Sequence, residues 1–149
     1  MDGATLIVIY SDHLATYQGT LIIDDGAIVI GGGTATYNMT YPPVCGPTTN
    51  ASAFCCVGDI QMPINSLTMN GSPVGITWDW WNYVTTATTV NAAQTTSNFT
   101  LTSTGDCFNL CVAGLYYQTA SCSVCPLVNP IANVAVCIIK QQAAQFVRL

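Results

Sequence analysis

Hydrophobic and polar residues alternate with a period of two along two stretches of the chain. In residues 33–41, threonine and asparagine alternate with alanine, methionine and tyrosine, and residues 98–104 repeat this arrangement with Phe99 and Leu101 at apolar positions. Successive side chains of a β-strand point to opposite faces of its sheet. The alternation therefore predicts two strands, each with one buried and one solvated face.

Five other runs are apolar at most positions. They are rich in Val, Ile, Tyr and Cys and lack helical spacing, which predicts strands buried on both faces. These runs are residues 4–10, 20–23, 27–30, 107–117 and 133–139. Turn-forming sequences punctuate the chain at Asp24-Asp25-Gly26, Gly31-Gly32-Gly33, Pro42-Pro43, Asn70-Gly71 and Gly105-Asp106.

Asn70-Gly71, between residues 66–69 and 74–77, is the best candidate for a two-residue hairpin turn. Only residues 90–97 and 141–149 have the composition of short helices. We therefore expect an all-β fold, an antiparallel β-sandwich of jelly-roll or Ig-like type. It would have about eight to ten strands and under about 15% helix.

The character of the sequence changes near residue 119. Residues 119–131 contain Cys122, Cys125 and two prolines, which interrupt strand pairing. We expect residues 1–118 to form the sandwich domain and residues 119–131 to form a disulfide-stapled linker. Residues 132–149 would then supply a C-terminal strand and a tail.

Charged residues make up 6% of the 149-residue chain, against roughly 25% in typical domains. All acidic residues are Asp, and the two basic residues are Lys140 and Arg148. Such a chain cannot form the basic patch that neutralises phosphates, so nucleic acids and anionic membrane surfaces are not expected partners. No apolar run reaches the roughly 18 residues of a spanning helix, so no transmembrane segment is expected.

The chain has eight cysteines, an even number at a density usual in oxidising compartments. Met1-Asp2-Gly3 lacks the basic region of a signal peptide, so either the protein stays inside the cell or a leader precedes this numbering. The cysteines favour the second alternative. We expect at least three disulfides among Cys45, Cys55, Cys56, Cys107, Cys111, Cys122, Cys125 and Cys137.

Strand geometry predicts that these disulfides join distant segments. Cys107 and Cys111 would lie on one side of a strand about 13 Å apart, too far to bond each other. Adjacent Cys55 and Cys56 would point to opposite faces. Cys107-x3-Cys111 with Cys122-x2-Cys125 also has spacings that suit zinc, although disulfides are the commoner outcome in an oxidising compartment.

Four N-glycosylation sequons begin at Asn38, Asn50, Asn70 and Asn98. Asn38 and Asn98 fall on the predicted solvated faces, where a glycan would fit and would keep a nearly uncharged surface soluble. Together, the cysteines and the sequons predict an extracellular or cell-surface protein.

The chain offers little material for catalysis. Its one histidine is His13, and Ser11-Asp12-His13 are direct neighbours that cannot direct their side chains at one another as a triad requires. We therefore expect no enzyme activity and no cofactor. Asp24-Asp25-Gly26 and Asp106 could offer oxygen ligands to calcium, although turn formation is the commoner role of such residues.

The densest aromatic stretch contains Trp78, Trp80, Trp81 and Tyr83. If exposed, these rings would suit stacking on sugars or contact between subunits. Packing against the core is the commoner role of such a cluster, and all three alternatives stay open.

Several short motifs resemble those of a known group of modules. Residues 3–12, Gly-Ala-Thr-Leu-Ile-Val-Ile-Tyr-Ser-Asp, and residues 21–26 are similar to a G-A-S-L-V-V-I-Y-S-D-P segment and an I-x-I-Y-D-G turn. These belong to uncharacterised extracellular β-sandwich modules in large secreted surface proteins of bacteria and archaea. Residues 66–71, 78–82 and 104–106 resemble the later L-x-L-N-G, W/D-x-x-N and T-x-G-D motifs of those modules.

The resemblance covers residues 3–118 and has departures. His13 stands where those modules often have proline, the cysteines are unusually many, and residues 119–149 have no counterpart. The resemblance implies a stalk or surface building block and not a catalyst.

Two functions from different classes follow. The first is a structural subunit of an extracellular filament or cell-surface assembly, because sheet edges in a chain without Glu and with a single Lys are poorly protected against pairing. The C-terminal run would either pair with a neighbouring copy or complete its own sheet. Its contact residues would be Val134, Val136, Ile138 and Ile139. The alternative is a carbohydrate-binding or adhesin module that uses the aromatic stretch.

Overall fold

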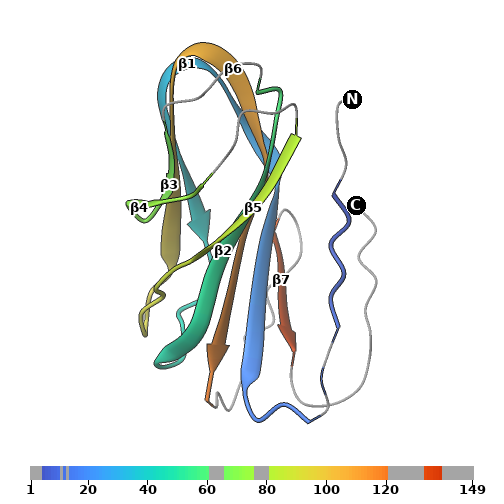
Figure 1. Ribbon diagram of the computed structural model, residues 1–149. Helices are drawn as coiled ribbons and strands as arrows, with labels where there is room; N and C mark the ends of the chain where they lie inside the picture. The colour runs from blue at the N-terminus through green and yellow to red at the C-terminus, as the bar shows by residue number, and fades with distance from the viewer. Residues whose placement is uncertain are drawn as a thin grey trace.

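The computed structural model describes residues 5–10, 12, 14–60, 66–75, 81–120 and 133–138, and for residues 27, 106, 108 and 133–138 it describes the backbone alone. The described residues form an all-β fold in which antiparallel strands build one curled sheet with the shape of a half-barrel (Figure 1). The prediction of an all-β antiparallel fold is confirmed.

Seven strands make up the sheet in the described residues. They are β1 (Gln18–Thr40), β2 (Thr48–Gly58), β3 (Ser66–Met69), β4 (Ser72–Pro73), β5 (Trp81–Ala87), β6 (Thr96–Thr119) and β7 (Asn133–Ile138). The strand order is β4-β3-β6-β1-β7, and β2 pairs with both β6 and β5.

Strands β1 and β6 run the whole length of the sheet side by side. They pair from Gln18 with Thr119 to Thr40 with Thr96, and the register shifts between Asp25 and Ile28 and again near Gly31. Figure 1 shows the two strands arching over together at one end of the molecule. This arch divides the sheet into two halves that share both strands.

We name the halves by their outer faces. The threonine half consists of residues 33–40 of β1 and 96–103 of β6, with β3 and β4. The covered half consists of residues 18–31 of β1 and 107–119 of β6, with β2, β5 and β7. The inner faces of both halves surround the main core.

The predicted turns at residues 24–26, 31–33 and 105–106 are wrong, because these residues lie within β1 and β6. Gly26, Gly32 and Gly33 have positive φ angles of 115°, 104° and 88°, which suits a β-bulge as well as a turn. Since the partner strand continues opposite them, the chain bulges and bends instead of reversing. Two long strands therefore replace several of the shorter ones expected.

The main core lies between the inner faces of the two halves. Met39, Met69, Phe99 and Leu101 come from the threonine half, and Leu115 is one of the residues that the covered half supplies. All five are at most 1% exposed. Burying such a side chain contributes about 1.5–3 kcal/mol, so this core is the main source of stability.

The outer face of the threonine half has the polar character that the alternating pattern predicts. The hydroxyls of Thr34 and Thr102 lie 3.1 Å apart, as do those of Thr36 and Thr100. Phe99 lies on the opposite, buried face. The predicted orientation of both alternating stretches is therefore confirmed.

The predicted hairpin turn at Asn70-Gly71 is confirmed, and its return strand is Ser72–Pro73, earlier in the chain than the predicted residues 74–77. Asn70 and Gly71 have φ angles of 47° and 80° and join β3 to β4, as a hairpin turn of the favoured kind requires. The short helix predicted for residues 90–97 is wrong: residues 90–95 form a loop and residues 96–97 begin β6. The second predicted helix, residues 141–149, lies outside the described residues.

Strand β7 pairs with β1 of its own chain, from Gly19 with Ile138 to Asp24 with Asn133. Of the two alternatives for the C-terminal run, the structure has the one in which it completes its own sheet. Ile139 and the predicted linker residues 121–131 lie outside the described residues. Within the described part of the chain, no helix is long and apolar enough to cross a membrane.

Candidate assembly surface

Residues 5–10, which we call the N-terminal segment, lie against the outer face of the covered half. Ile7 and Ile9 pack against a second buried cluster formed by Ile23, Phe54, Cys56 and Val112. At one end of the segment, Trp81 Nε1 donates a hydrogen bond of 2.9 Å to Thr5 Oγ1. The segment therefore covers part of the outer face of the covered half as an additional layer.

The far side of the N-terminal segment is exposed and apolar. Leu6, Val8 and Tyr10 are 87%, 65% and 78% exposed. The prediction that residues 4–10 are buried on both faces is therefore wrong for these positions. The physical reason is that no described residue covers the segment, so its alternate side chains face solvent. A line of exposed large hydrophobic residues is typical of a contact surface.

The backbone of the N-terminal segment is extended but belongs to no strand pair. From Leu6 to Tyr10 it makes no hydrogen bond with another described residue. Within the described part of the chain its N–H and C=O groups have no partner there, and a second strand could satisfy them.

Strands β5 and β7 form the two edges of the covered half, since among the described strands β5 pairs only with β2 and β7 only with β1. The sequence of β5 is Trp-Asn-Tyr-Val-Thr-Thr-Ala, and that of β7 is Asn-Val-Ala-Val-Cys-Ile. Neither contains a charged residue or a proline, which are the usual protections of an edge strand against pairing with another chain.

The predicted aromatic site is only partly placed by the structure. Trp78 and Trp80 lie outside the described residues. Trp81 is half-buried against the second cluster, whereas Tyr83 is 53% exposed on the same outer face of β5. The rings of Tyr83 and Phe54 are 6.3 Å apart and tilted by 44°. Trp81 therefore packs within the molecule, and Tyr83 adds an exposed ring beside the edge.

Four of the predicted disulfide cysteines are free thiols: Cys55, Cys56, Cys107 and Cys111. The prediction that they are bridged to distant segments is therefore wrong for this structure. The expectation that adjacent Cys55 and Cys56 point to opposite faces is confirmed, because Cys55 faces the main core and Cys56 faces the second cluster. Ala113 and Val84 flank Cys55 in the neighbouring strands, so no cysteine stands directly opposite it.

The other predicted cysteines add little to the site. Cys45 lies between β1 and β2 and is disulfide-bonded. The side chains of Cys122, Cys125 and Cys137 lie outside the described residues, as does any zinc site that would need Cys122 and Cys125.

Three sequon asparagines lie in one row across the threonine half. Asn38 pairs with Asn98, and Asn98 exchanges bonds with Asn70: its N–H donates to Asn70 Oδ1 at 2.9 Å and its carbonyl accepts from Asn70 N at 2.8 Å. Asn70 Nδ2 also donates to Ser97 Oγ at 3.2 Å. Asn38 is exposed on the outer strand of the row, so it is the best placed of the three for modification.

The fourth sequon asparagine, Asn50, is exposed in β2 and has a positive φ of 49°. Its side-chain amide donates to Gln118 Oε1 at 2.8 Å. This bond ties the Asn50 side chain to β6.

The carboxylates proposed for calcium do not converge. Asp24 is 2% exposed and accepts a hydrogen bond of 2.5 Å from the Tyr37 hydroxyl. Asp25 is exposed opposite Val112, and the backbone of Asp106 lies in β6 about 20 Å along the strand from Val112. Asp24 instead joins the two halves, because Tyr37 belongs to the threonine half.

The environment of Asp24 is unfavourable for a charge. Burial raises the pKa of its carboxyl, and the Tyr37 hydrogen bond opposes this only in part. In the described residues, no group of three or more His, Cys, Asp or Glu side chains could hold a metal ion. His13 lies outside those residues.

An open pocket of 530 Å³ lies beside the hairpin turn and the loop before β6. Its lining is neutral and polar, and no pattern in the sequence indicates it. The lining residues are Asn70, Ser72, Ala87, Thr88, Thr89, Asn91 and Gln94. Gln94 is held in place because its Nε2 donates to Thr96 O at 2.8 Å.

Comparison of the chain with protein-family models, curated proteins and solved structures found no match. The resemblance to bacterial and archaeal surface modules therefore stays a prediction. Function has to be argued from the surfaces of this chain.

Proposed function

We propose that the protein is a structural subunit of an extracellular filament or cell-surface assembly, in which copies join by β-strand pairing. The observation that carries this proposal is the uncharged, proline-free edge of β5, on the half of the sheet that also bears the exposed N-terminal segment. Open edges of this kind invite another strand, and a head-to-tail repeat of such a contact gives a filament.

Pairing between the edge strands of two copies is compatible with the position of β7 in its own sheet. Because β7 pairs with its own β1, it does not need to be donated to a neighbour. Among the described strands, the second edge of β7, which contains Val134, Val136 and Ile138, and the second edge of β5 are both unpaired, so contacts between copies could form there. Strand addition would satisfy backbone groups of both chains at either edge.

The exposed apolar line of the N-terminal segment supports the same proposal. Leu6, Val8 and Tyr10 would be covered when two copies pack, which removes apolar surface from water. Since the chain has 6% charged residues, few like charges oppose the contact.

We further propose that the protein is a glycosylated β-sandwich module of the extracellular space and not an enzyme. The support is the exposed Asn38 sequon on a solvated threonine face, the eight cysteines, and a chain with no Glu and one His. A glycan at Asn38 would keep the uncharged outer face soluble.

Electron microscopy and light scattering of the full chain test the proposal, with Thr85→Lys as the edge variant. Thr85 is exposed in β5, so a lysine there would protect the edge and shift the material toward monomer. Thr102→Lys is the matched control, because Thr102 lies in β6 between β3 and β1 and is not at an edge. A wild-type protein that stays monomeric at all concentrations would overturn the proposal.

The alternative function, carbohydrate binding, is favoured by the neutral polar pocket with its amide and hydroxyl lining. Sugars are recognised by such groups, so a monomer would bind neutral oligosaccharides there. Calorimetry with wild type and with Thr88→Val plus Thr89→Val would test this function. Equal binding by both proteins, or none by either, would count against it.

A further inference from the structure

We propose that Cys56 and Cys111 form a redox-active thiol pair, which oxidised glutathione or a similar small-molecule disulfide converts into a disulfide between β2 and β6. The pair lies beneath the N-terminal segment on the outer face of the covered half. It belongs to a single chain, so it does not depend on how copies associate.

The register of β2 and β6 places the two cysteines next to each other. Cys56 pairs with Val112 and Val57 pairs with Leu110, which leaves Cys111 as the extra residue of a β-bulge. In a bulge, two residues of one strand oppose one residue of the other. Cys111 is therefore the chain neighbour of Val112, the residue directly opposite Cys56. Cα atoms joined by a disulfide lie about 4.4–6.8 Å apart, so the proposal requires the bulge to hold Cys111 nearly as close to Cys56 as Val112 is.

Both side chains also lie on the same face of the sheet. Cys56 belongs to the second buried cluster, and Cys111 packs against that cluster. Leu110 and Ala113, on either side of the bulge, belong to the main core on the opposite face. The bulge is what turns Cys111 to the face of Cys56, because in a regular strand residues 111 and 112 would point to opposite faces.

The other two free thiols are not placed for this reaction. Cys55 faces the main core, where burial raises its pKa to about 12. Cys107 is exposed near the arch, and its neighbour across the ladder is Gly31. These two cysteines therefore serve as internal controls of the same residue type.

The exposure of the two thiols sets the order of the reaction. Cys56 is fully buried, whereas Cys111 is half-buried and its thiol lies 3.7 Å from the Asn109 carbonyl. The Cys111 thiolate would attack oxidised glutathione and release one glutathione thiolate, leaving a mixed disulfide on Cys111. The Cys56 thiolate would then attack the Cys111 sulfur and release the second glutathione.

The step is balanced in electrons and protons. The two protein thiols lose two electrons and two protons, and one molecule of oxidised glutathione becomes two of reduced glutathione. Burial raises the pKa of both thiols, and Cys56 also has a hydrogen bond with Thr5. The thiolate fraction is therefore small while the N-terminal segment is in place, so the reaction should be faster at higher pH.

Peptide mapping of the folded full chain tests the pair directly. The protein is incubated with oxidised glutathione, the remaining thiols are alkylated, and the digest is analysed by mass spectrometry. We expect a Cys56–Cys111 cross-linked peptide whose mass is lower by two hydrogen atoms than that of the separate peptides. This measurement on wild type needs no variant that has to fold.

Variants then assign the roles. Cys111→Ser and Cys56→Ala should abolish the cross-link, and Cys55→Ser and Cys107→Ser should retain it, each checked for a β-type circular dichroism spectrum. The proposal is overturned if Cys111 of the wild type stops at the glutathione adduct, or if Cys56 and Cys111 are both alkylated after oxidation. It is also overturned if Cys56 is bridged to another cysteine.

Discussion

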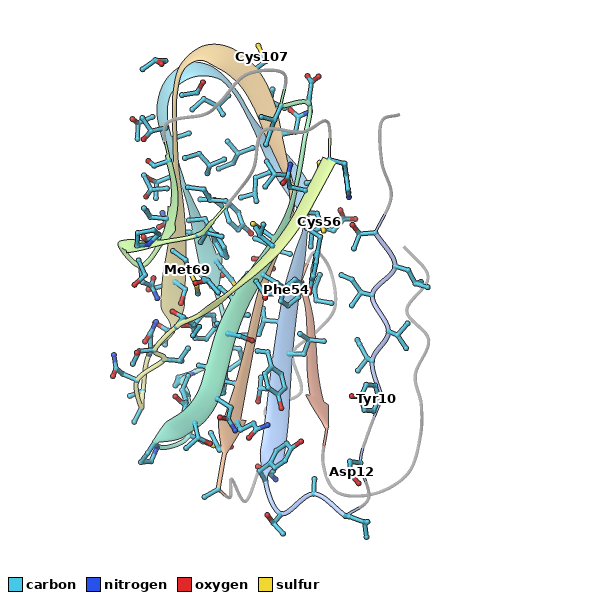
Figure 2. The ribbon with its side chains drawn as sticks, in the orientation of Figure 1. Tyr10, Asp12, Phe54, Cys56, Met69 and Cys107 are labelled. Carbon is cyan, nitrogen blue, oxygen red and sulfur yellow. The ribbon has the colours of Figure 1, made fainter. Side chains whose placement is uncertain are left out.

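The outer faces of the threonine half and the covered half differ in chemistry although β1 and β6 contribute to both. On the threonine half, paired hydroxyls such as those of Thr36 and Thr100 meet water directly. On the covered half, the same two strands present Ile23 and Val112 beneath the N-terminal segment. Figure 2 shows Phe54 and Cys56 on the covered half and Tyr10 on the segment that runs beside it.

This difference shows that an alternating run and an apolar run in the sequence place different demands on the outer face of a sheet. Alternation of polar and apolar residues in 33–40 and 96–103 produces a face that needs no further layer. Predominantly apolar sequence in 20–23 and 107–117 produces a second face that must be covered. Here the cover is a single extended segment, which moves the exposed apolar surface outward to Leu6 and Val8 without removing it.

The largest effect is expected from the core that both halves share. Phe99→Ala should lower the free energy of unfolding by about 3–5 kcal/mol, because Phe99 is fully buried and its removal leaves a cavity. Denaturant unfolding followed by circular dichroism measures this loss. A loss below about 1 kcal/mol would mean that the threonine half is not packed on the core as described.

A smaller effect is expected on the outer face of the covered half alone. Gly114→Ala should cost about 1–3 kcal/mol, because a Cβ at residue 114 would overlap the ring of Phe54. Thr100→Ala, on the outer face of the same strand in the threonine half, is the matched control and should cost only about 0.2–1 kcal/mol. Equal losses in the two variants would remove the distinction between the faces.

The most gradual effect is expected from pH, through the contact between Asp24 and Tyr37 that joins the halves. Burial raises the pKa of folded Asp24 above the ordinary value of 3.8, so the folded protein binds this proton more tightly than the unfolded chain. The resulting stability is fully present below pH 3.8 and is lost as pH rises through the folded pKa. Asp24→Asn should remove this dependence and Asp25→Asn should retain it, as thermal unfolding at several pH values would measure.

Local chemistry made part of the fold predictable from the sequence. The alternation around Phe99 and the Asn70-Gly71 turn depend on neighbouring residues alone, and both were predicted correctly. The glycine sites at residues 26 and 31–33 could not be resolved in this way. A positive φ suits both a turn and a bulge, and the partner strand that decides between them lies far away in the sequence.

The candidate surfaces were harder to predict than the fold. The free strand edges and the segment that covers the second cluster depend on which strands pair with each other. The periodicity of the sequence does not indicate these pairings. The sequence spacing of Cys107 and Cys111 indicated that they could not bond each other, and it did not indicate Cys56 as a neighbour of Cys111. The approach of Cys111 to Cys56 depends on a bulge in the register between β2 and β6. A long-range pairing of this kind leaves no local signal.

The pairing of β1 with β6 along their whole length has a consequence for the speed of folding. Gln18 meets Thr119 and Thr40 meets Thr96, so the central ladder of the sheet joins segments that are synthesised far apart in time. Ladders between distant segments form slowly, because the chain loses the entropy of closing a long loop before any favourable contact forms. Until β6 leaves the ribosome, β1 lacks both of the strands with which it pairs, and β2 can pair only with β5. We therefore expect slow refolding and aggregation at high concentration during that interval.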